Sequence, residues 1–237
     1  MRSSSNDAAE IVSQILFGEP VRIIELNENW TKIQTEVDKY DGVVDPKQLA
    51  PLHENDYLKW LDNFEYLPNM NININTPIGK QLISRGSFVG KDLNFNIGNY
   101  AFELSENKTS ARANSLWNTS KDYLTTPYLW GGKSSFGIDC SGLIQVVFRL
   151  HDVELPRDVS QQVKLGQEIG YDDKKEGDLA FFYNANNKVT HVGIIGPKST
   201  VIHASGYVRN DELTVNGIWN LERRLLTHKL ACIKRII

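Results

Sequence analysis

A cysteine and two histidines have the residue types and positions that nucleophilic catalysis requires. Cys140 follows the glycine-containing stretch from Gly131 to Asp139 and precedes apolar residues at helical spacing, namely Leu143, Val146, Val147 and Leu150. This pattern places Cys140 at or near a helix N-terminus. Free N–H groups and the helix dipole favour an anion there, so we expect the thiol to ionise below its free pKa of about 8.5. A small buried cysteine is the alternative interpretation.

His191 and His203 are predicted to lie side by side on one face of a sheet. Alternation along Val189 to Ile195 puts His191 on one face, and alternation along Val201 to Ser205 does the same for His203. A hairpin centred on Pro197 pairs residue 191 with residue 203 and brings their Cβ atoms to roughly 4.5–5.5 Å. The two imidazoles are therefore expected directly opposite one another.

These three side chains can supply the nucleophile, the base and the orienting group of a thiol-dependent reaction. A neutral imidazole next to Cys140 accepts the thiol proton, and a third polar group on the other ring nitrogen fixes the tautomer of that base. The backbone N–H of Cys140 is the natural oxyanion donor. Zinc is the competing interpretation, because one cysteine and two histidines are known ligands and Asp139 could join them. Since no further ligand lies at a recognisable spacing, we expect no metal and no cofactor.

Composition excludes several classes of partner. The 237 residues carry a formal net charge of −3 with a pI near 6.0, so the chain lacks the basic footprint of a nucleic-acid or membrane-surface protein. Two cysteines do not make a disulfide framework. The N-terminal residues contain no apolar run of signal-peptide length. We therefore expect a cytoplasmic protein, with a processed periplasmic or secreted form as the alternative.

The N-terminal half has the pattern of small β structures. Short strands are predicted at 11–17, 21–26, 30–35 and 42–44, with turn clusters between them that favour a small barrel. Residues 53–66 have helical spacing, and the Asn-rich stretch 68–76 is expected to be an irregular link. Strands at 81–84, 88–89 and 99–104 predict a second small β unit, whose glycines and asparagines favour turns.

The C-terminal half combines helices with antiparallel strands. A helix is predicted over about 111–124, and Asp158 to Gln161 has the spacing of a capping box for another that reaches about residue 165. Strands are predicted at 177–183, 189–195, 200–204 and 229–236. One helical half and one strand half define an α+β fold.

Several motifs in sequence resemble the NlpC-type family of papain-like cell-wall peptidases. They are Tyr128 to Gly132, Asp139 to Leu143, Leu155 to Asp158, Glu176 to Phe182, Thr190 to Ile194 and Val201 to Ala204. The front of the chain resembles the bacterial SH3 domains that precede such peptidases, through Gln14 to Glu19, Trp30 to Ile33 and Asp38 to Val44. Val43 stands where tryptophan is common.

The resemblance implies three domains and a set of site residues. It implies an SH3-like domain over 1–52, a linker with a probable second SH3-like unit over 53–109, and a papain-like peptidase domain over 110–237. It also implies that Cys140 is the nucleophile, His191 the base and His203 the orienting residue. The implied subsite residues are Tyr128, Trp130, Asp139, Ser141, Arg157, Asp158 and Ser160. Glu19 and Tyr40 are implied to bind the free amine of the substrate.

The implied activity is that of a γ-D-glutamyl-L-diamino acid endopeptidase, of the dipeptidyl-peptidase VI type. Such an enzyme cuts muropeptides with a free N-terminal L-Ala and releases L-Ala-γ-D-Glu, so its partners are peptidoglycan-derived peptides. Two alternatives remain open at this point: a non-catalytic module that binds cell-wall peptide, and an acyltransferase on the same core. The diamino acid that follows D-Glu is not determined by the sequence.

Overall fold

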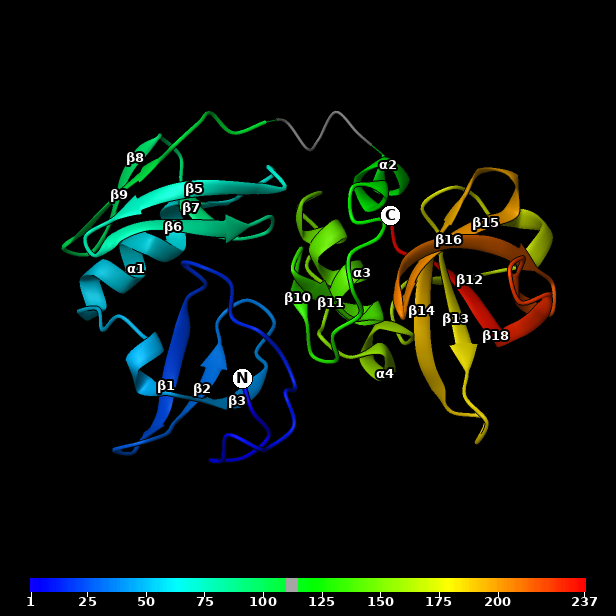
Figure 1. Cartoon of the computed structure of the whole chain (residues 1–237), viewed down its shortest axis with the longest axis horizontal. Coiled ribbons are helices and arrows are strands. Elements are labelled where there is room, and N and C mark those ends of the chain that lie inside the picture. Colours follow the sequence, from blue (N-terminus) through cyan, green and yellow to red (C-terminus); the bar gives the residue numbers. More distant parts are fainter. Residues whose placement is uncertain (110–114) are drawn as a thin grey trace. The chain divides into compact units, whose positions relative to one another are not determined.

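The computed structural model describes residues 1–109 and 115–237, which form two compact units. The first unit holds residues 1–111 together with 130–135, and the second holds residues 112–129 and 136–237. Figure 1 labels most of the helices and strands of both units. Few helices and mostly antiparallel strands give the predicted α+β class.

The first unit begins with a three-stranded antiparallel sheet. Its strands are β1 (Val21–Leu26), β2 (Thr31–Thr35) and β3 (Asp41–Val44), followed by the short 3-10 helix η1 (Pro46–Gln48). These three strands confirm the predictions for residues 21–44. The strand predicted over 11–17 is wrong, because only Ile11 forms an isolated bridge, with Arg2. The chain turns at the end of that stretch, where Glu19 N–H donates to the Leu16 carbonyl.

A helix and six strands complete the first unit up to residue 104. They are α1 (Glu54–Asn63), β4 (Phe64–Tyr66), β5 (Asn71–Thr76), β6 (Gly79–Ser84), β7 (Phe88–Gly90), β8 (Asn94–Ile97) and β9 (Tyr100–Leu104). The prediction of an irregular link over 68–76 is wrong, because residues 71–76 form β5. Ile72 and Ile74 are buried there and alternate with asparagines, so the period of two outweighs the turn preference of Asn.

The second unit packs short helices against a closed sheet. Its helices are α2 (Leu116–Lys121), α3 (Cys140–Arg149) and α4 (Val159–Gln162), and the 3-10 turns are η2 (Tyr171–Asp173) and η3 (Pro197–Ser199). The larger strands are β12 (Gln167–Ile169), β13 (Leu179–Tyr183), β14 (Val189–Gly196), β15 (Thr200–Ser205), β16 (Tyr207–Thr214), β17 (Gly217–Asn220) and β18 (Leu225–Arg235). The two-residue strand β11 (Gly137–Ile138) also lies in this unit, whereas the two-residue strand β10 (Lys133–Ser134) belongs to the first unit.

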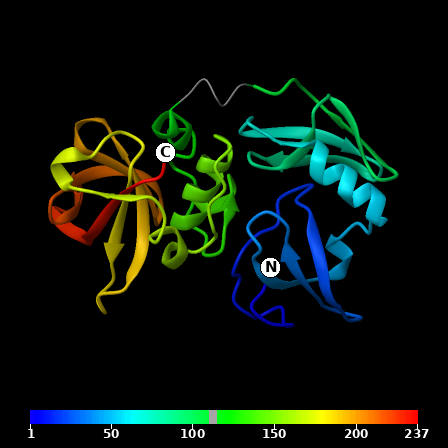
Figure 2. The same cartoon turned by 180° about the vertical axis from the view of Figure 1, so that it is seen from behind.

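The sheet of the second unit runs in the order β12-β18-β13-β14-β15-β16-β17, and β17 also pairs with β18. The sheet therefore closes on itself, which removes most of its free edges; Figure 2 shows it from behind. A cluster of buried residues fills it, among them Phe182, Ile195 and Val201.

Two helices of the second unit differ from prediction. The helix expected over 111–124 is described from Leu116, and Ala111 and Ala113 lie outside the described residues. The helix after Asp158 ends at Gln162, and the Asp158 side chain makes no capping hydrogen bond, so the predicted capping box is wrong.

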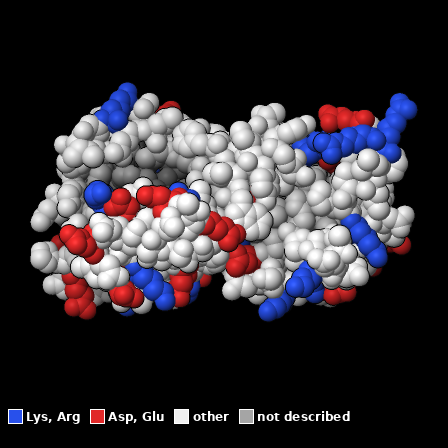
Figure 3. All heavy atoms as spheres, turned by 60° about the horizontal axis from the view of Figure 1, so that its bottom comes forward, with Lys and Arg blue, Asp and Glu red and all other residues white. Residues whose placement is uncertain are grey.

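The surface carries charges of both signs (Figure 3). Side chains of both charge signs occur over the face drawn in Figure 3, as the small net charge requires. Among the described residues, no helix combines the length and apolar character needed to cross a bilayer.

Candidate active site

Cys140 is the first residue of α3, as predicted from its spacing. Asp139 caps the helix, since its carboxylate oxygen Oδ1 accepts the Gly142 N–H at 2.7 Å. The Cys140 N–H belongs to the first turn, whose N–H groups have no partner within the helix. An oxyanion that forms next to the thiol would therefore meet a donor that already points out of the helix end.

A buried arginine holds this helix start in place. Arg157 donates from Nη1 to Asp139 Oδ1 at 3.0 Å and to Ser141 Oγ at 2.8 Å, and from Nη2 to Asp139 Oδ2 at 2.5 Å. Arg157 is only 1% exposed, so it is not a surface charge. Three of the predicted subsite residues thus form one buried ion pair network at the start of the helix that carries Cys140. Their contact with substrate stays a prediction.

The two predicted histidines meet on one face, but in a different register from the one expected. Gly193 stands opposite His203, and Gly196 stands opposite Thr200, so the loop is Pro197 to Ser199 and is centred on Lys198 rather than on Pro197. Lys198 and Ser199 both adopt positive φ to close this loop. The register moved by two residues, which preserves the face. His191 and His203 are therefore diagonal neighbours, and their rings meet edge to face rather than stacked, at 86°.

The hydrogen bonds of the histidines define a relay that ends on a carboxylate. Nε2 of His191 lies 2.8 Å from Nδ1 of His203, and Nε2 of His203 lies 3.1 Å from Oδ2 of Asp211. The Asp211 carboxylate also receives two hydrogen bonds from Arg209, at 2.7 and 3.1 Å. Because an ionised carboxylate only accepts, His203 donates from Nε2 and accepts at Nδ1, which makes His191 Nε2 the donor. The lone pair of His191 is thereby left on Nδ1, as a general base requires.

Asp211 remains charged at this buried position. Burial by itself would raise the pKa of Asp211, but the hydrogen bonds from His203 and Arg209 outweigh it and hold this pKa below its usual value. Burial lowers the pKa of His203, although Asp211 opposes the shift. Burial, with the neighbouring imidazoles His203 and His228, holds the pKa of His191 well below 6.5. His191 is therefore neutral and able to accept a proton at neutral pH.

The thiol lies against the backbone on both sides of His191. Sγ of Cys140 donates to the Thr190 carbonyl at 3.9 Å, and the Val192 N–H faces the sulfur. The expectation of an easily ionised thiol is wrong for the resting state, since burial and then the Asp139 charge raise the pKa of Cys140 to about 12. The helix N-terminus is outweighed by the loss of water. The thiol form of Cys140 is therefore favoured over the thiolate in the resting state.

Two residues of this site escaped the sequence analysis. Asp211 lies on β16, a strand that the sequence analysis did not predict. The sequence feature that could have revealed Asp211 is an acidic residue at a position that alternation would bury. His228 on β18 stacks on His191, with ring centroids 4.3 Å apart and planes at 21°. Its distance along the chain from the other two histidines gave no signal of this contact.

The remaining subsite residues of the second unit surround Cys140 to different degrees. Tyr128 is half-buried, and burial, together with the negative charges of ionised Cys140 and Asp139, raises the pKa of its hydroxyl to about 12. Its phenol is therefore protonated at neutral pH and can donate a hydrogen bond near Cys140. Asp158 is half-buried at the start of α4, and Ser160 is exposed within that helix. Their contact with substrate stays a prediction.

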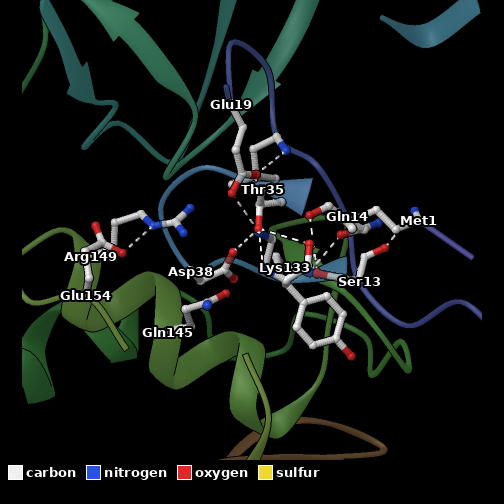
Figure 4. A network of polar contacts seen from close by, with 12 residues as sticks. Met1, Ser13, Gln14, Glu19, Thr35, Asp38, Lys133, Gln145, Arg149 and Glu154 are labelled. Carbon is white, nitrogen blue, oxygen red and sulfur yellow. Dashed lines mark hydrogen bonds and ion pairs between the residues drawn. The ribbon is translucent and has the colours of Figure 1, made fainter. Parts of the chain in front are cut away.

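Three predicted site residues lie in the first unit. Trp130 is 60% exposed and donates from Nε1 to Glu10 at 2.6 Å, and Tyr40 is half-buried at the turn before β3. Glu19 is fully buried and binds Nζ of Lys133 at 3.0 and 3.2 Å, as Figure 4 shows. A cation of the chain itself already neutralises the Glu19 carboxylate. A substrate amine would have to share it with Lys133.

Sequence comparison matches two known domains in this chain, one over the region of the site and one at the N-terminus. Residues 125–225 match the NlpC/P60 family, and residues 1–49 match the bacterial dipeptidyl-peptidase SH3 domain.

Some of the relatives are named as dipeptidyl-peptidases. The chain is 37% identical over 106 residues to a γ-D-glutamyl-L-lysine dipeptidyl-peptidase of Bacillus subtilis, a match that covers 44% of this chain and 35% of that protein. It is 28% identical over 246 residues to dipeptidyl-peptidase 6 of Lysinibacillus sphaericus, covering 89% and 85% of the two chains. The chain thus spans about a third of the length of the Bacillus subtilis relative.

A solved structure shares the fold. An NlpC/P60 family protein from Bacillus cereus superimposes with a TM-score of 0.77 at 22% identity, covering 94% of this chain and 81% of that one. At this identity the likeness concerns the fold alone.

Proposed function

We propose that this protein is a cysteine peptidase that hydrolyses the γ-D-glutamyl-L-diamino acid bond of muropeptides. The observation that carries the proposal is the relay from His191 through His203 to Asp211, beside a cysteine at the start of a helix. Each hydrogen bond in this relay directs the free lone pair of His191 to Nδ1. This is the arrangement that a thiol nucleophile needs from its base.

In the proposed mechanism, Cys140 passes its proton to Nδ1 of His191 and attacks the carbonyl carbon of the γ-glutamyl amide. The oxyanion forms at the Cys140 N–H, and the new imidazolium is stabilised through His203 by the charge of Asp211. His191 then protonates the departing amine, which leaves a thioester on Cys140. Water, deprotonated by His191, attacks the thioester carbon and releases the dipeptide with the free thiol.

The substrate class follows from the relatives rather than from the site geometry. A γ-D-glutamyl-L-lysine dipeptidyl-peptidase and a dipeptidyl-peptidase 6 are among them, which supports L-Ala-γ-D-Glu-diamino acid peptides as substrates and L-Ala-γ-D-Glu as the product. We further propose that the protein acts in the cytoplasm on peptides recycled from the cell wall.

Product analysis of a defined peptide tests the proposal. Purified wild type should convert L-Ala-γ-D-Glu-L-Lys to L-Ala-γ-D-Glu and free lysine, as measured by mass spectrometry. Cys140→Ala should give no product, whereas Cys232→Ala should give the wild-type products, since Cys232 is a half-buried residue of β18. Absence of the dipeptide in the wild-type reaction would refute the substrate, and turnover by Cys140→Ala would refute the mechanism.

A further inference from the structure

A third imidazole joins the two histidines of the relay. His191, His203 and His228 come from β14, β15 and β18, and each offers a ring nitrogen within 4.8 Å of those of the other two. The relay accounts for His191 and His203 but gives His228 no chemical task. Three imidazoles that converge in this way are the ligand set that zinc accepts, with a water as the fourth ligand.

The tautomer of His203 favours metal binding at this cluster. Because its Nε2–H is held by Asp211 at 3.1 Å, the lone pair of His203 lies on Nδ1, which faces His191. A carboxylate on the far nitrogen of a metal-binding histidine is the usual outer-shell partner of zinc sites, where it orients the ring and raises its basicity. Asp211, fixed by Arg209, is already in that position.

The three imidazoles are shielded from water to different degrees. His228 is half-buried, whereas His191 and His203 are buried.

The geometry demands only side-chain rearrangement. In a tetrahedral zinc site the ligand nitrogens lie about 3.3 Å apart, given Zn–N distances of about 2.0–2.1 Å. His191 Nε2 and His203 Nδ1, at 2.8 Å, must open slightly, and His228 must rotate out of its stack on His191. His191 moves its proton from Nε2 to Nδ1 in this state, so no proton is released.

We propose that His191, His203 and His228 form a reversible site for Zn²⁺ that switches the enzyme off. Zinc at this site consumes the Nε2 of His191 and the Nδ1 of His203, and it leaves the base with a proton on Nδ1, where the thiol proton must go. The metal-free protein is the active form. Binding does not depend on the proposed peptidase activity; only its inhibitory effect rests on that proposal.

Calorimetric titration of Zn²⁺ into the full-length Cys140→Ala protein tests the site without any turnover. We expect one Zn²⁺ per chain. In the same background His228→Phe, which keeps an aromatic ring against His191, should weaken binding about a hundredfold, since losing a direct ligand costs at least as much as losing an outer-shell partner. His228→Gln serves as a second variant, and circular dichroism checks the fold of each.

The matched control is His53→Gln in the same background. His53 is exposed in the first unit and its side chain makes no capping hydrogen bond to α1, so its loss should leave Zn²⁺ affinity unchanged. Equal affinity in the proteins with and without His228 would overturn the proposal. Zinc binding by wild type that disappears in Cys140→Ala would also overturn it, because the ligands would then be the thiol and the base.

The inhibitory effect has its own readout. Peptide hydrolysis by wild type should fall on addition of Zn²⁺ and return with a chelator, and chelator alone should not reduce the rate. Mg²⁺ should have no effect, because it prefers oxygen ligands in octahedral geometry. Loss of activity on chelation, restored by Zn²⁺, would contradict the inhibitory role.

Discussion

At the scale of residues, Cys140 and His191 should behave as one unit. Cys140→Ala and His191→Ala each remove the thiolate that attacks, so each is expected to abolish measurable turnover and the double variant should add little. His203→Gln should retain more activity, because an amide still offers His191 a hydrogen-bond acceptor. Steady-state rates of the four variants check this. Independent, multiplicative losses would contradict it.

Asp211 acts on the reaction as a positioning residue, through His203. Asp211→Asn removes one charge-assisted hydrogen bond, worth about 1.5–3 kcal/mol, so kcat should fall about ten- to hundredfold with little change in KM. Glu222→Gln is the control, since Glu222 is an exposed partner of the same Arg209 at 3.3 Å and lies outside the relay. An equal fall in both variants, or a change confined to KM, would contradict this role.

The sequence predicted the residues of the site better than their chemistry. Helical spacing after Cys140 and alternation around His191 and His203 were sufficient, because both depend on local periods. The thiol pKa depends on burial by distant segments, and Asp211 and His228 meet the relay only through strand pairing. Neither effect is encoded in local spacing.

At the scale of elements, the approach of β14 to β15 limits what position 193 tolerates. A Cβ on Gly193 would lie 2.9 Å from the Ile202 carbonyl oxygen and 3.0 Å from the His203 Cβ. Gly193→Ala should therefore destabilise the protein by about 1–3 kcal/mol and lower kcat by displacing His203. Urea unfolding and rate measurements check this together.

Gly170→Ala provides the comparison, because its Cβ would meet only the end of the Asp173 side chain, at 3.2 Å. It should leave both stability and rate nearly unchanged. If Gly193→Ala behaves like Gly170→Ala, the close approach of the two strands does not constrain His203.

The elements were predicted where the pattern was long or the turn chemistry clear. β1, β2, β3, β13, β14 and β15 lie where alternation placed them. β5 was missed because asparagines alternate with its buried isoleucines, and β16 because exposed polar residues alternate with its buried ones. β17 is only four residues long, which is too short for a clear pattern. The hairpin register required the loop conformation of Lys198 and Ser199, which residue types alone do not give.

At the scale of the whole molecule, the buried imidazoles make stability depend on pH. The folded-state pKa values of His191, His203 and His228 lie below the unfolded value of about 6.5, so the unfolded chain binds protons that the folded chain does not. These three histidines therefore do not lower the free energy of unfolding above about pH 6.5, and they lower it progressively as the pH falls below that value. The melting temperature should drop between pH 7 and pH 5, and less so in His228→Gln.

Equal drops in wild type and His228→Gln would contradict the contribution of His228 to this acid sensitivity.

The α+β class itself could be predicted from the sequence, since it needs only the succession of helical and alternating patterns. The closed sheet could not, because closure depends on the pairing of β17 with β18.

The central claim is that His191 makes the buried Cys140 thiol reactive at neutral pH. Burial raises the pKa of Cys140 to about 12, so the thiol by itself is almost fully protonated at pH 7. The direct measurement is the rate of iodoacetamide alkylation at Cys140, followed by peptide mass spectrometry in wild type and in His191→Ala, with Cys232 as the internal reference. We predict rapid alkylation of Cys140 at pH 7 in wild type and slow alkylation in His191→Ala that recovers only at high pH. Equal rates at pH 7 in the two proteins would contradict the claim.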